Sequence, residues 1–227
     1  MNLLTAKEIR KSFTDRELFS GIDFSIEEQD KTGIVGINGT GKSTLLRILA
    51  GEEEPDAGEI VKGNRVWVRY LPQNPEFPKG ITLCDYVITA NRTEDNEWSI
   101  AGDGKEILNL MGFEDENEVI DHLSGGQKKM AALAAALTAP CDILLLDEPT
   151  NHLNSEMILW LEQALIRRKG ALVMVTHDRY FLDRVCNRIV EIRRGKLYSY
   201  QTNFEGYLEA KAKREEQEQA AYRKNRN

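Results

Sequence analysis

The sequence predicts an α/β fold with a mostly parallel core sheet, and three observations indicate it. Residues 36–44 match the phosphate-binding pattern G-x-x-x-x-G-K-[ST] without a departure. Residues 143–146 and 171–176 are two apolar runs, and polar residues follow each of them. Such runs are typical of parallel strands buried on both faces, where ligands bind at the carboxyl ends of the strands.

The composition favours one large domain over two small ones. The 227 residues include six prolines and no low-complexity tract, and 37 acidic against 30 basic residues give a net charge of −7. That charge argues against nucleic-acid binding through the overall field, although a local basic strip remains possible. The longest apolar run, residues 130–137, is too short to span a membrane, and the N-terminus shows no signal-like stretch. We therefore expect no membrane span and a cytoplasmic location.

The three cysteines, Cys84, Cys141 and Cys186, are odd in number and widely spaced. This spacing favours reduced thiols over a disulfide framework or a zinc site. We expect each of them to act as a small buried apolar residue.

The N-terminal region predicts an antiparallel pair of strands. Residues 3–13 and 18–26 alternate apolar and polar side chains around a polar segment, residues 14–17. Phe13 lies where an aromatic ring could stack on adenine, and a core position is an equally open interpretation.

The phosphate-binding pattern, here called the phosphate loop (residues 36–44), lies between a predicted strand, residues 32–35, and a predicted helix, residues 45–50. Glycines let successive backbone N–H groups and the helix N-terminus face an anion, here the β- and γ-phosphates of a nucleotide. Lys42 would add a positive charge, and the Ser43 hydroxyl would bind Mg²⁺. The alternative is a glycine-rich turn without a ligand.

The segments after the loop helix predict a turn, a strand and a stiff loop. Residues 52–58 indicate a solvated acidic turn, and residues 59–71 alternate again and predict one strand. Gln73 follows on a loop stiffened by Pro72 and Pro75, where an ordinary loop role is the alternative.

The middle of the chain predicts a surface excursion and then two helices. Residues 89–104 are polar and indicate an excursion or small helical segment, and a helix is expected at about residues 105–111. Leu123-Ser124-Gly125-Gly126-Gln127 precedes an Ala-rich and Leu-rich helix, residues 128–137. Its small residues would expose N–H groups to an anion, and the alternative is an N-cap Ser124 with a glycine turn.

Two acids and a histidine follow the apolar runs. Asp147 and Glu148 fall at the sheet edge where the phosphate loop also falls. Adjacent strand residues point opposite ways, so one carboxylate could contact a metal shell and the next a water. His177 is placed to touch the γ-phosphate. The alternatives are two surface acids and a helix-capping histidine.

The C-terminal part predicts a hairpin and an exposed helix. Residues 189–192 and 196–200 flank a turn at Arg193-Arg194-Gly195, and residues 207–227 are highly charged. We expect the charged stretch to be a helix with few core contacts at the beginning of a linker.

The phosphate loop, Gln73, the Leu-Ser-Gly-Gly-Gln run, Asp147-Glu148 and His177 occur in the order and rough spacing of an ABC-type ATPase domain, which the chain resembles over nearly its whole length. The resemblance implies a P-loop NTPase of ABC type over residues 1–206. That domain would comprise an antiparallel β subdomain and a helical subdomain at about residues 74–140. The beginning of a linker, residues 207–227, would follow it. It also implies an ATP sandwich, in which residues 123–127, the signature segment, close over ATP held by a second ABC domain of a longer chain or homodimer.

The resemblance also implies the roles of the site residues. Glu148 would orient the attacking water, His177 would sense the γ-phosphate, and Ser43, Gln73 and Asp147 would hold Mg²⁺, with Gln73 also sensing the water. The implied ATP-binding residues are Phe13, Gly36, Asn38, Gly39, Thr40, Gly41, Lys42, Ser43, Thr44, Ser124, Gly125, Gly126 and Gln127.

Finer features resemble the ABC-F proteins. These features are residues 148–154, residues 176–182 and the run into the charged helix, residues 200–209. That branch carries two ATPase domains on one chain without a membrane domain and commonly acts on ribosomes, in translation or antibiotic resistance. The resemblance therefore implies an ATP hydrolase with a ribosomal partner, and the alternative is the ATPase subunit of an ABC membrane transporter.

Three positions depart from the family pattern. Asn154 stands where an Asp-like residue is usual, and Met130 and Ala135 stand where arginines are usual. These changes bear on the tightness of the closed sandwich rather than on nucleotide binding. The interval from Gln73 to Leu123 is short for ABC-F, so a ribosome-contacting arm inserted there would be reduced or absent.

Overall fold

The computed structural model describes residues 1–14, 16–93, 96 and 99–224. Parts of three predicted segments lie outside the described residues: Asp15 of the polar turn, residues 94–95 and 97–98 of the polar excursion, and residues 225–227 of the charged tail.

The core is a six-stranded, mostly parallel sheet, as the apolar runs predict. Its strand order is β5-β6-β7-β3-β8-β9, with only β9 antiparallel to its neighbour. The strands are β5 Val68–Leu71, β6 Ile143–Asp147, β7 Ala171–Val175, β3 Lys31–Val35, β8 Arg188–Arg193 and β9 Lys196–Tyr200. Every residue of β6 and β7 is buried, because helices or a second sheet cover both faces.

A second, antiparallel sheet has the order β2-β1-β4, with β1 Asn2–Phe13, β2 Arg16–Glu27 and β4 Ala57–Lys62. The predicted N-terminal pair is present as β1 and β2. The single strand expected over residues 59–71 is wrong, because β4 pairs with β1 whereas β5 pairs with β6 in the core sheet. The chain turns between the two sheets across residues 63–67, where Arg65 adopts a φ of +63°.

Seven α-helices and one 3-10 helix lie in the described part of the chain. They are α1 Lys42–Ala50, α2 Leu83–Asn91, α3 Ile100–Leu110, η1 Ile120–His122, α4 Gly125–Leu137, α5 Ser155–Arg167, α6 Arg179–Val185 and α7 Phe204–Lys224. The excursion expected over residues 89–104 is shorter than predicted, since α2 extends to Asn91 and α3 begins at Ile100. Ile100, Gly104 and Leu108 are buried at four-residue spacing, which accounts for the earlier start of α3.

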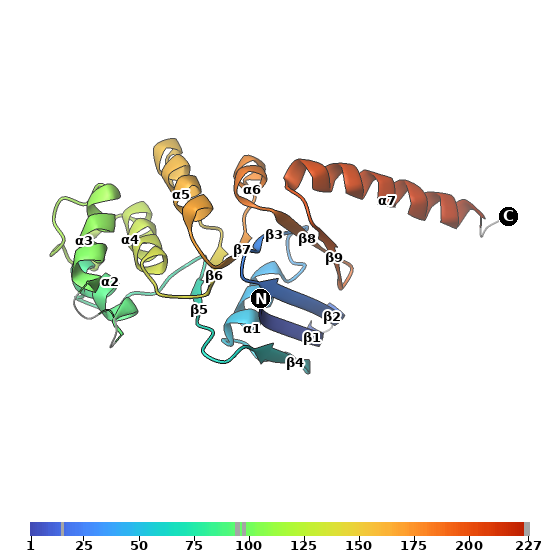
Figure 1. The fold of residues 1–227 in the computed structure, drawn as a ribbon, viewed down its shortest axis with the longest axis horizontal. Coiled ribbons are helices and arrows are strands. Elements are labelled where there is room, and N and C mark those ends of the chain that lie inside the picture. The colour runs from blue at the N-terminus through green and yellow to red at the C-terminus, as the bar shows by residue number, and fades with distance from the viewer. Residues whose placement is uncertain (15, 94–95, 97–98, 225–227) are drawn as a thin grey trace.

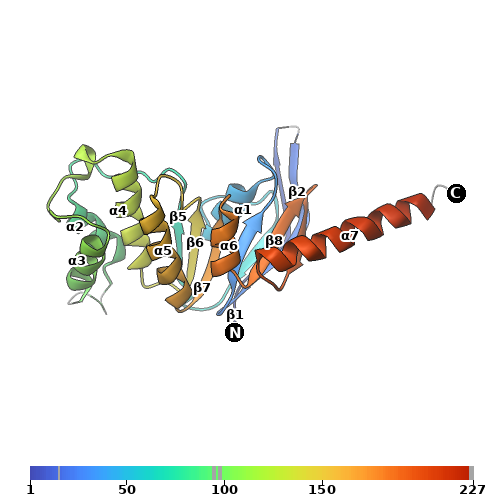
Figure 2. The same ribbon diagram turned by 90° about the horizontal axis from the view of Figure 1, so that it is seen from above.

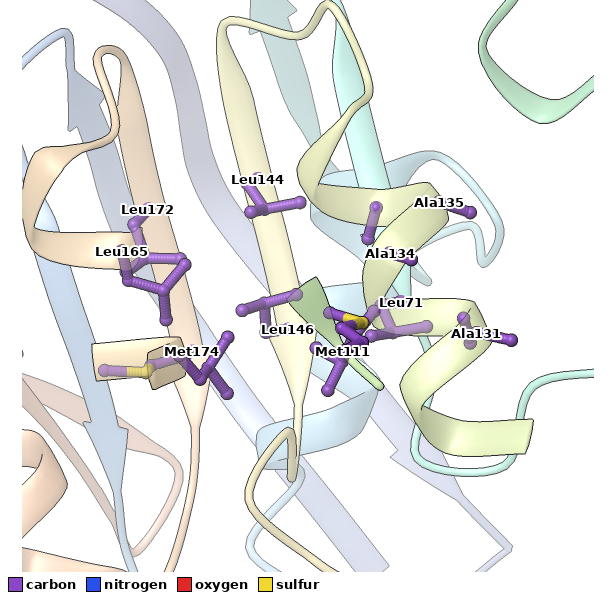
Figure 3. Close-up of a cluster of buried hydrophobic side chains, with 14 of the residues drawn as sticks. Leu71, Met111, Ala131, Ala134, Ala135, Leu144, Leu146, Leu165, Leu172 and Met174 are labelled. Carbon is purple, nitrogen blue, oxygen red and sulfur yellow. The ribbon is translucent and has the colours of Figure 1, made fainter. Parts of the chain in front are cut away.

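The alternation of side chains in β6 and β7 divides the core into two clusters. Leu144, Leu146, Leu172 and Met174 pack with α4 and α5 on one face of the sheet, as Figure 3 shows. Ile143 and Val173 point to the opposite face and pack with α1 and the antiparallel sheet. In Figures 1 and 2, α2 and α3 lie at one end of the molecule and α7 extends from the other. The parallel strands β3, β6 and β7 end at Val35, Asp147 and Val175, directly before the phosphate loop, Glu148 and residues 176–177.

Helix α7 is held to the core more firmly than the sequence predicts. Phe204 and Tyr207 in its first turn pack against the hydrophobic cluster. Lys211 and Arg214 form ion pairs with the buried Glu191 of β8, at 2.6 and 2.8 Å. Arg193 of β8 also pairs with Glu215 of α7 at 3.0 Å, so ion pairs with the core sheet extend beyond the apolar contacts of the first turn.

The cysteines and the helices can be compared with the predictions of reduced thiols and of no membrane span. All three cysteines are free; Cys186 is buried, and Cys84 and Cys141 are partly buried. Among the described residues, none of the helices combines the length and the apolar character that crossing a lipid bilayer requires.

Candidate nucleotide site

The phosphate loop connects β3 to α1 through backbone conformations that require glycine. A β-carbon on Gly36 would lie 2.8 Å from the Ile192 carbonyl oxygen, and one on Gly41 would lie 2.8 Å from the Phe19 ring. Gly39 and Gly41 adopt φ angles of +78° and +97°. The loop therefore curls tightly against β8 and β2 and leads directly into the N-terminus of α1, where unpaired N–H groups favour an anion.

Lys42 is the first residue of α1, and its side chain folds back over the loop. Its ammonium donates to the Gly36 carbonyl at 2.9 Å and to the Ile37 carbonyl at 3.3 Å. Burial lowers the pKa of Lys42, and the Glu148 and Asp147 carboxylates oppose that change. The ammonium is thus held at the loop, next to two acids.

Asp147 and Glu148 are both buried, with exposed fractions of 2% and 5%, which excludes the interpretation as surface acids. Asp147 ends β6, and its Oδ2 accepts from the Tyr70 hydroxyl at 3.5 Å. Glu148 adopts a φ of +49°, a conformation that costs energy in a residue with a side chain, and its N–H donates to the Val175 carbonyl at 2.8 Å. Burial raises the pKa of the Glu148 carboxyl, and the His177 side chain and backbone amide partly oppose this.

His177 follows β7 and contacts the Glu148 carboxylate twice. Its Nε2 lies 3.3 Å from Oε1, and its backbone N–H donates to Oε2 at 3.3 Å. The capping interpretation does not hold, since Asp178 is the N-cap of α6 and accepts from the Phe181 N–H at 3.0 Å. The imidazole itself remains largely exposed.

A cavity of about 660 Å³, here called the nucleotide cavity, brings most of the predicted residues together. Its predicted lining residues are Phe13, Asn38, Gly39, Gly41, Lys42, Ser43, Thr44, Gln73, Asp147, Glu148 and His177. Phe13 is 45% exposed rather than in the core. Gly36 and Thr40 line an adjoining cavity of about 450 Å³, which α7 also borders.

The signature segment lies outside this cavity. Ser124 and Gln127 form a capping box at the start of α4: the Ser124 hydroxyl accepts from the Gln127 N–H at 3.3 Å, and the Gln127 side chain accepts from the Ser124 N–H at 2.9 Å. Both residues are exposed, and neither lines the nucleotide cavity. The N-cap interpretation of Ser124 is correct, and it leaves the other N–H groups at the start of α4 open to a ligand from outside the domain.

The acidic end of the cavity fits a divalent cation. Asp147 Oδ1 is buried, and no described residue forms a hydrogen bond with it. A buried carboxylate oxygen without a partner is costly, and a cation would satisfy it. The hydroxyl of Ser43 and the amide of Gln73 line the same cavity and are oxygen donors of the type that Mg²⁺ binds.

Arg16, at the start of β2, is a lining residue that the sequence analysis did not identify. Its guanidinium lies against the phosphate loop, since a β-carbon on Gly39 would lie 3.1 Å from Arg16 Nη1. No carboxylate in the described part of the chain forms an ion pair with it. The pattern of β2 gave no signal for this role, because a charged residue after a turn is ordinary.

The departures from the family pattern have local structural roles. The Asn154 side chain caps α5 by accepting from the Met157 N–H at 2.9 Å. Ala135 is fully buried, and its carbonyl accepts from the Asn91 side chain at 2.6 Å. Met130 is partly buried against the hydrophobic cluster around α4. The two α4 positions thus contribute packing, and an arginine at the fully buried Ala135 would need rearrangement of its neighbours.

Comparison of the sequence with known proteins finds two matching family models and several similar full-length proteins. A family model described as ABC transporter matches residues 19–151, and a second model with the same description matches residues 190–227. The chain is 40% identical, over its whole length, to the uncharacterized ABC transporter ATP-binding protein YfmR of Bacillus subtilis, of which it spans 42%. It is 33% identical to the energy-dependent translational throttle protein EttA of Mycobacterium tuberculosis, with 93% of this chain and 44% of that protein aligned.

A plant relative and a solved structure extend the comparison. The ABC transporter F family member 2 of Arabidopsis thaliana is 35% identical over 92% of this chain and 31% of that protein. The dimeric structure of MJ0796, a bacterial ABC transporter cassette, matches the fold with a TM-score of 0.76 over 88% of this chain and 98% of that one, at 23% identity. The chain thus spans less than half the length of YfmR, EttA and the F family member.

Proposed function

The chain belongs to the ABC transporter family as an ATPase domain, and from this premise we propose that it binds and hydrolyses ATP with Mg²⁺ in the nucleotide cavity. In this proposal the chain forms half of an ABC-F type sandwich that acts on ribosomes. The observation that carries the proposal is the convergence of the phosphate loop, Gln73, Asp147, Glu148 and His177 on one cavity.

The reaction is in-line attack of water on the γ-phosphate, and the protein supplies positioning and charge. The loop N–H groups and the Lys42 ammonium bind the phosphates, and Phe13 stacks on adenine. The Glu148 carboxylate orients the attacking water and accepts its proton, a role that its raised pKa favours. His177 donates from its backbone to Glu148 and presents its imidazole toward the γ-phosphate. Ser43, Gln73 and Asp147 would hold Mg²⁺, which would supply positive charge to the phosphates.

One domain carries two half-sites, because its signature segment lies outside its own cavity. Closure therefore needs a second ABC domain, from the same longer chain or from a second copy. The test is ATP turnover per molecule of this chain against protein concentration. We expect turnover to rise with concentration as pairs form. A specific rate that does not depend on concentration would contradict the shared site.

Ribosomal action is supported by the ABC-F-like residues around Glu148 and His177 and by the relatives EttA and the F family member. The test is co-sedimentation of the natural full-length protein, carrying Glu148→Gln to retain ATP, with ribosomes. Migration with ribosomes only when ATP is present is expected. Protein that stays in the supernatant with and without ATP would contradict ribosomal action and direct the search to a membrane partner.

A further inference from the structure

Lys129 of α4 is a buried lysine for which the proposed reaction has no use. It is only 4% exposed. Its ammonium donates to the Gln73 carbonyl at 3.1 Å, to the Pro72 carbonyl at 3.4 Å and to the Asp147 carbonyl at 3.5 Å. A buried ammonium is costly unless its protons are satisfied, and here three carbonyls accept them.

The three carbonyls belong to the ends of two neighbouring strands. Pro72 and Gln73 follow β5, and Asp147 ends β6, which pairs with β5 in parallel. The side chains of Gln73 and Asp147 line the nucleotide cavity, whereas Lys129 does not. The ammonium therefore binds the backbone carbonyls of two cavity-lining residues, Gln73 and Asp147, from a position outside the cavity.

The charge of Lys129 also acts on the acids. Burial lowers its pKa, and the Asp147 and Glu148 carboxylates oppose that change. The charged forms of Lys129 and of these carboxylates thus stabilise one another electrostatically. In contrast, the neighbouring Lys128 is partly exposed, and its side chain has no hydrogen bond or ion pair with a described residue.

The helix that carries Lys129 also carries the signature segment at its N-terminus, two residues away at Gln127. We propose that Lys129 is a positioning residue that couples the two half-sites of one domain, so that ATP bound beside Gln73 and Asp147 changes the start of α4. The proposal rests on the proposed function, because the signature segment has a ligand only in the sandwich. A displacement of any of the three carbonyls on ATP binding would be transmitted to α4 through the Lys129 side chain.

Hydrogen exchange of the chain, at a concentration too low for pairing, tests this coupling. All variants carry Glu148→Gln so that ATP remains intact, and exchange is compared with and without ATP and Mg²⁺. In the parent we expect slower exchange at the phosphate loop and a change of at least about threefold at residues 124–130. Lys129→Met should keep the first response and lose the second. Lys129→Arg should retain both, and Lys128→Met is the matched control on the same helix.

The outcomes separate this inference from the proposed function. If the parent shows no response at the phosphate loop, ATP binding and the inference both fail. If the loop responds and residues 124–130 respond equally in the parent and in Lys129→Met, only the coupling is overturned. Loss of both responses in Lys129→Met without recovery in Lys129→Arg would also overturn it, because the residue would then serve only the integrity of the site.

Kinetics of the paired protein with native Glu148 give a second readout. Lys129→Met should lower kcat at least about tenfold and change KM for ATP less than about threefold, since the phosphate contacts remain. A loss of kcat/KM that comes entirely from a higher KM, with kcat unchanged, would contradict a positioning role.

Discussion

The Glu148 carboxylate and the His177 imidazole lie 3.3 Å apart, and the His177 backbone N–H donates to the same carboxylate. The two residues follow the carboxyl ends of neighbouring parallel strands, β6 and β7. Glu148 is buried whereas His177 is largely exposed, so the histidine can contact a ligand while it orients the acid. This geometry is the basis for the role proposed for Glu148 as the base that orients the attacking water.

Glu148→Gln should leave ATP binding within about twofold and slow hydrolysis at least about a hundredfold, because the amide cannot accept the proton of water. Phosphate release by the paired protein checks the rate, and titration with a fluorescent ATP analogue checks binding. Glu106→Gln, an exposed change on α3, is the control. Unchanged turnover would remove Glu148 from the proposed role.

Lys42→Ala should weaken ATP binding at least about tenfold, because in the proposed complex the ammonium contacts the phosphates of bound ATP before the reaction. Hydrogen bonds between charged groups are stronger than those between neutral groups. Equilibrium titration of the chain with labelled ATP measures the affinity. Lys79→Ala, on an exposed loop, should bind as the parent does. An affinity equal to the parent's would show that Lys42 does not contact the nucleotide.

Arg16→Ala should weaken binding of ATP and ADP about tenfold, because the guanidinium lies against the phosphate loop and forms no ion pair with a carboxylate of the described residues. Adenosine, which has no phosphate, should bind within about twofold of the parent value. Competition against the labelled analogue measures all three ligands, with Arg16→Lys expected between parent and alanine. Equal losses for ATP and adenosine would indicate a general defect of the cavity.

Glu191→Gln should lower the free energy of unfolding by about 1–3 kcal/mol at pH 7, because Lys211 and Arg214 lose their buried partner. Burial alone would raise the pKa of Glu191, but the hydrogen bonds and charges of Lys211 and Arg214 outweigh it and lower the pKa below 4.5. The carboxylate therefore stabilises the fold fully above about pH 4.5, and this contribution is lost as the pH falls through the folded-state pKa.

Urea unfolding at several pH values checks the Glu191 prediction. The difference between the parent and Glu191→Gln should be largest near neutral pH and should narrow below about pH 4.5. Glu216→Gln, an exposed change on α7, should show neither effect. A difference that does not depend on pH would contradict the ion-pair explanation.

The sequence predicted features whose signal is local. The glycines of the phosphate loop, the apolar runs of β6 and β7 and the acids at Asp147 and Glu148 each follow from a short stretch of chain. Features that depend on a distant partner were missed. The segment over residues 59–71 reads as one alternating strand, yet β4 and β5 join different sheets. Arg16 shows nothing unusual in sequence until Gly39 is placed beside it.

The sequence alone predicted the mostly parallel sheet and a set of candidate nucleotide-binding residues, because motif spacing and apolar runs act through the local backbone. Only the tertiary structure decided which of these residues share a cavity and which do not. It placed Glu148 against His177, left Ser124 and Gln127 outside the cavity and buried Lys129 against the Gln73 carbonyl. These outcomes depend on strand order and helix packing, which join residues far apart in the chain and leave no local pattern.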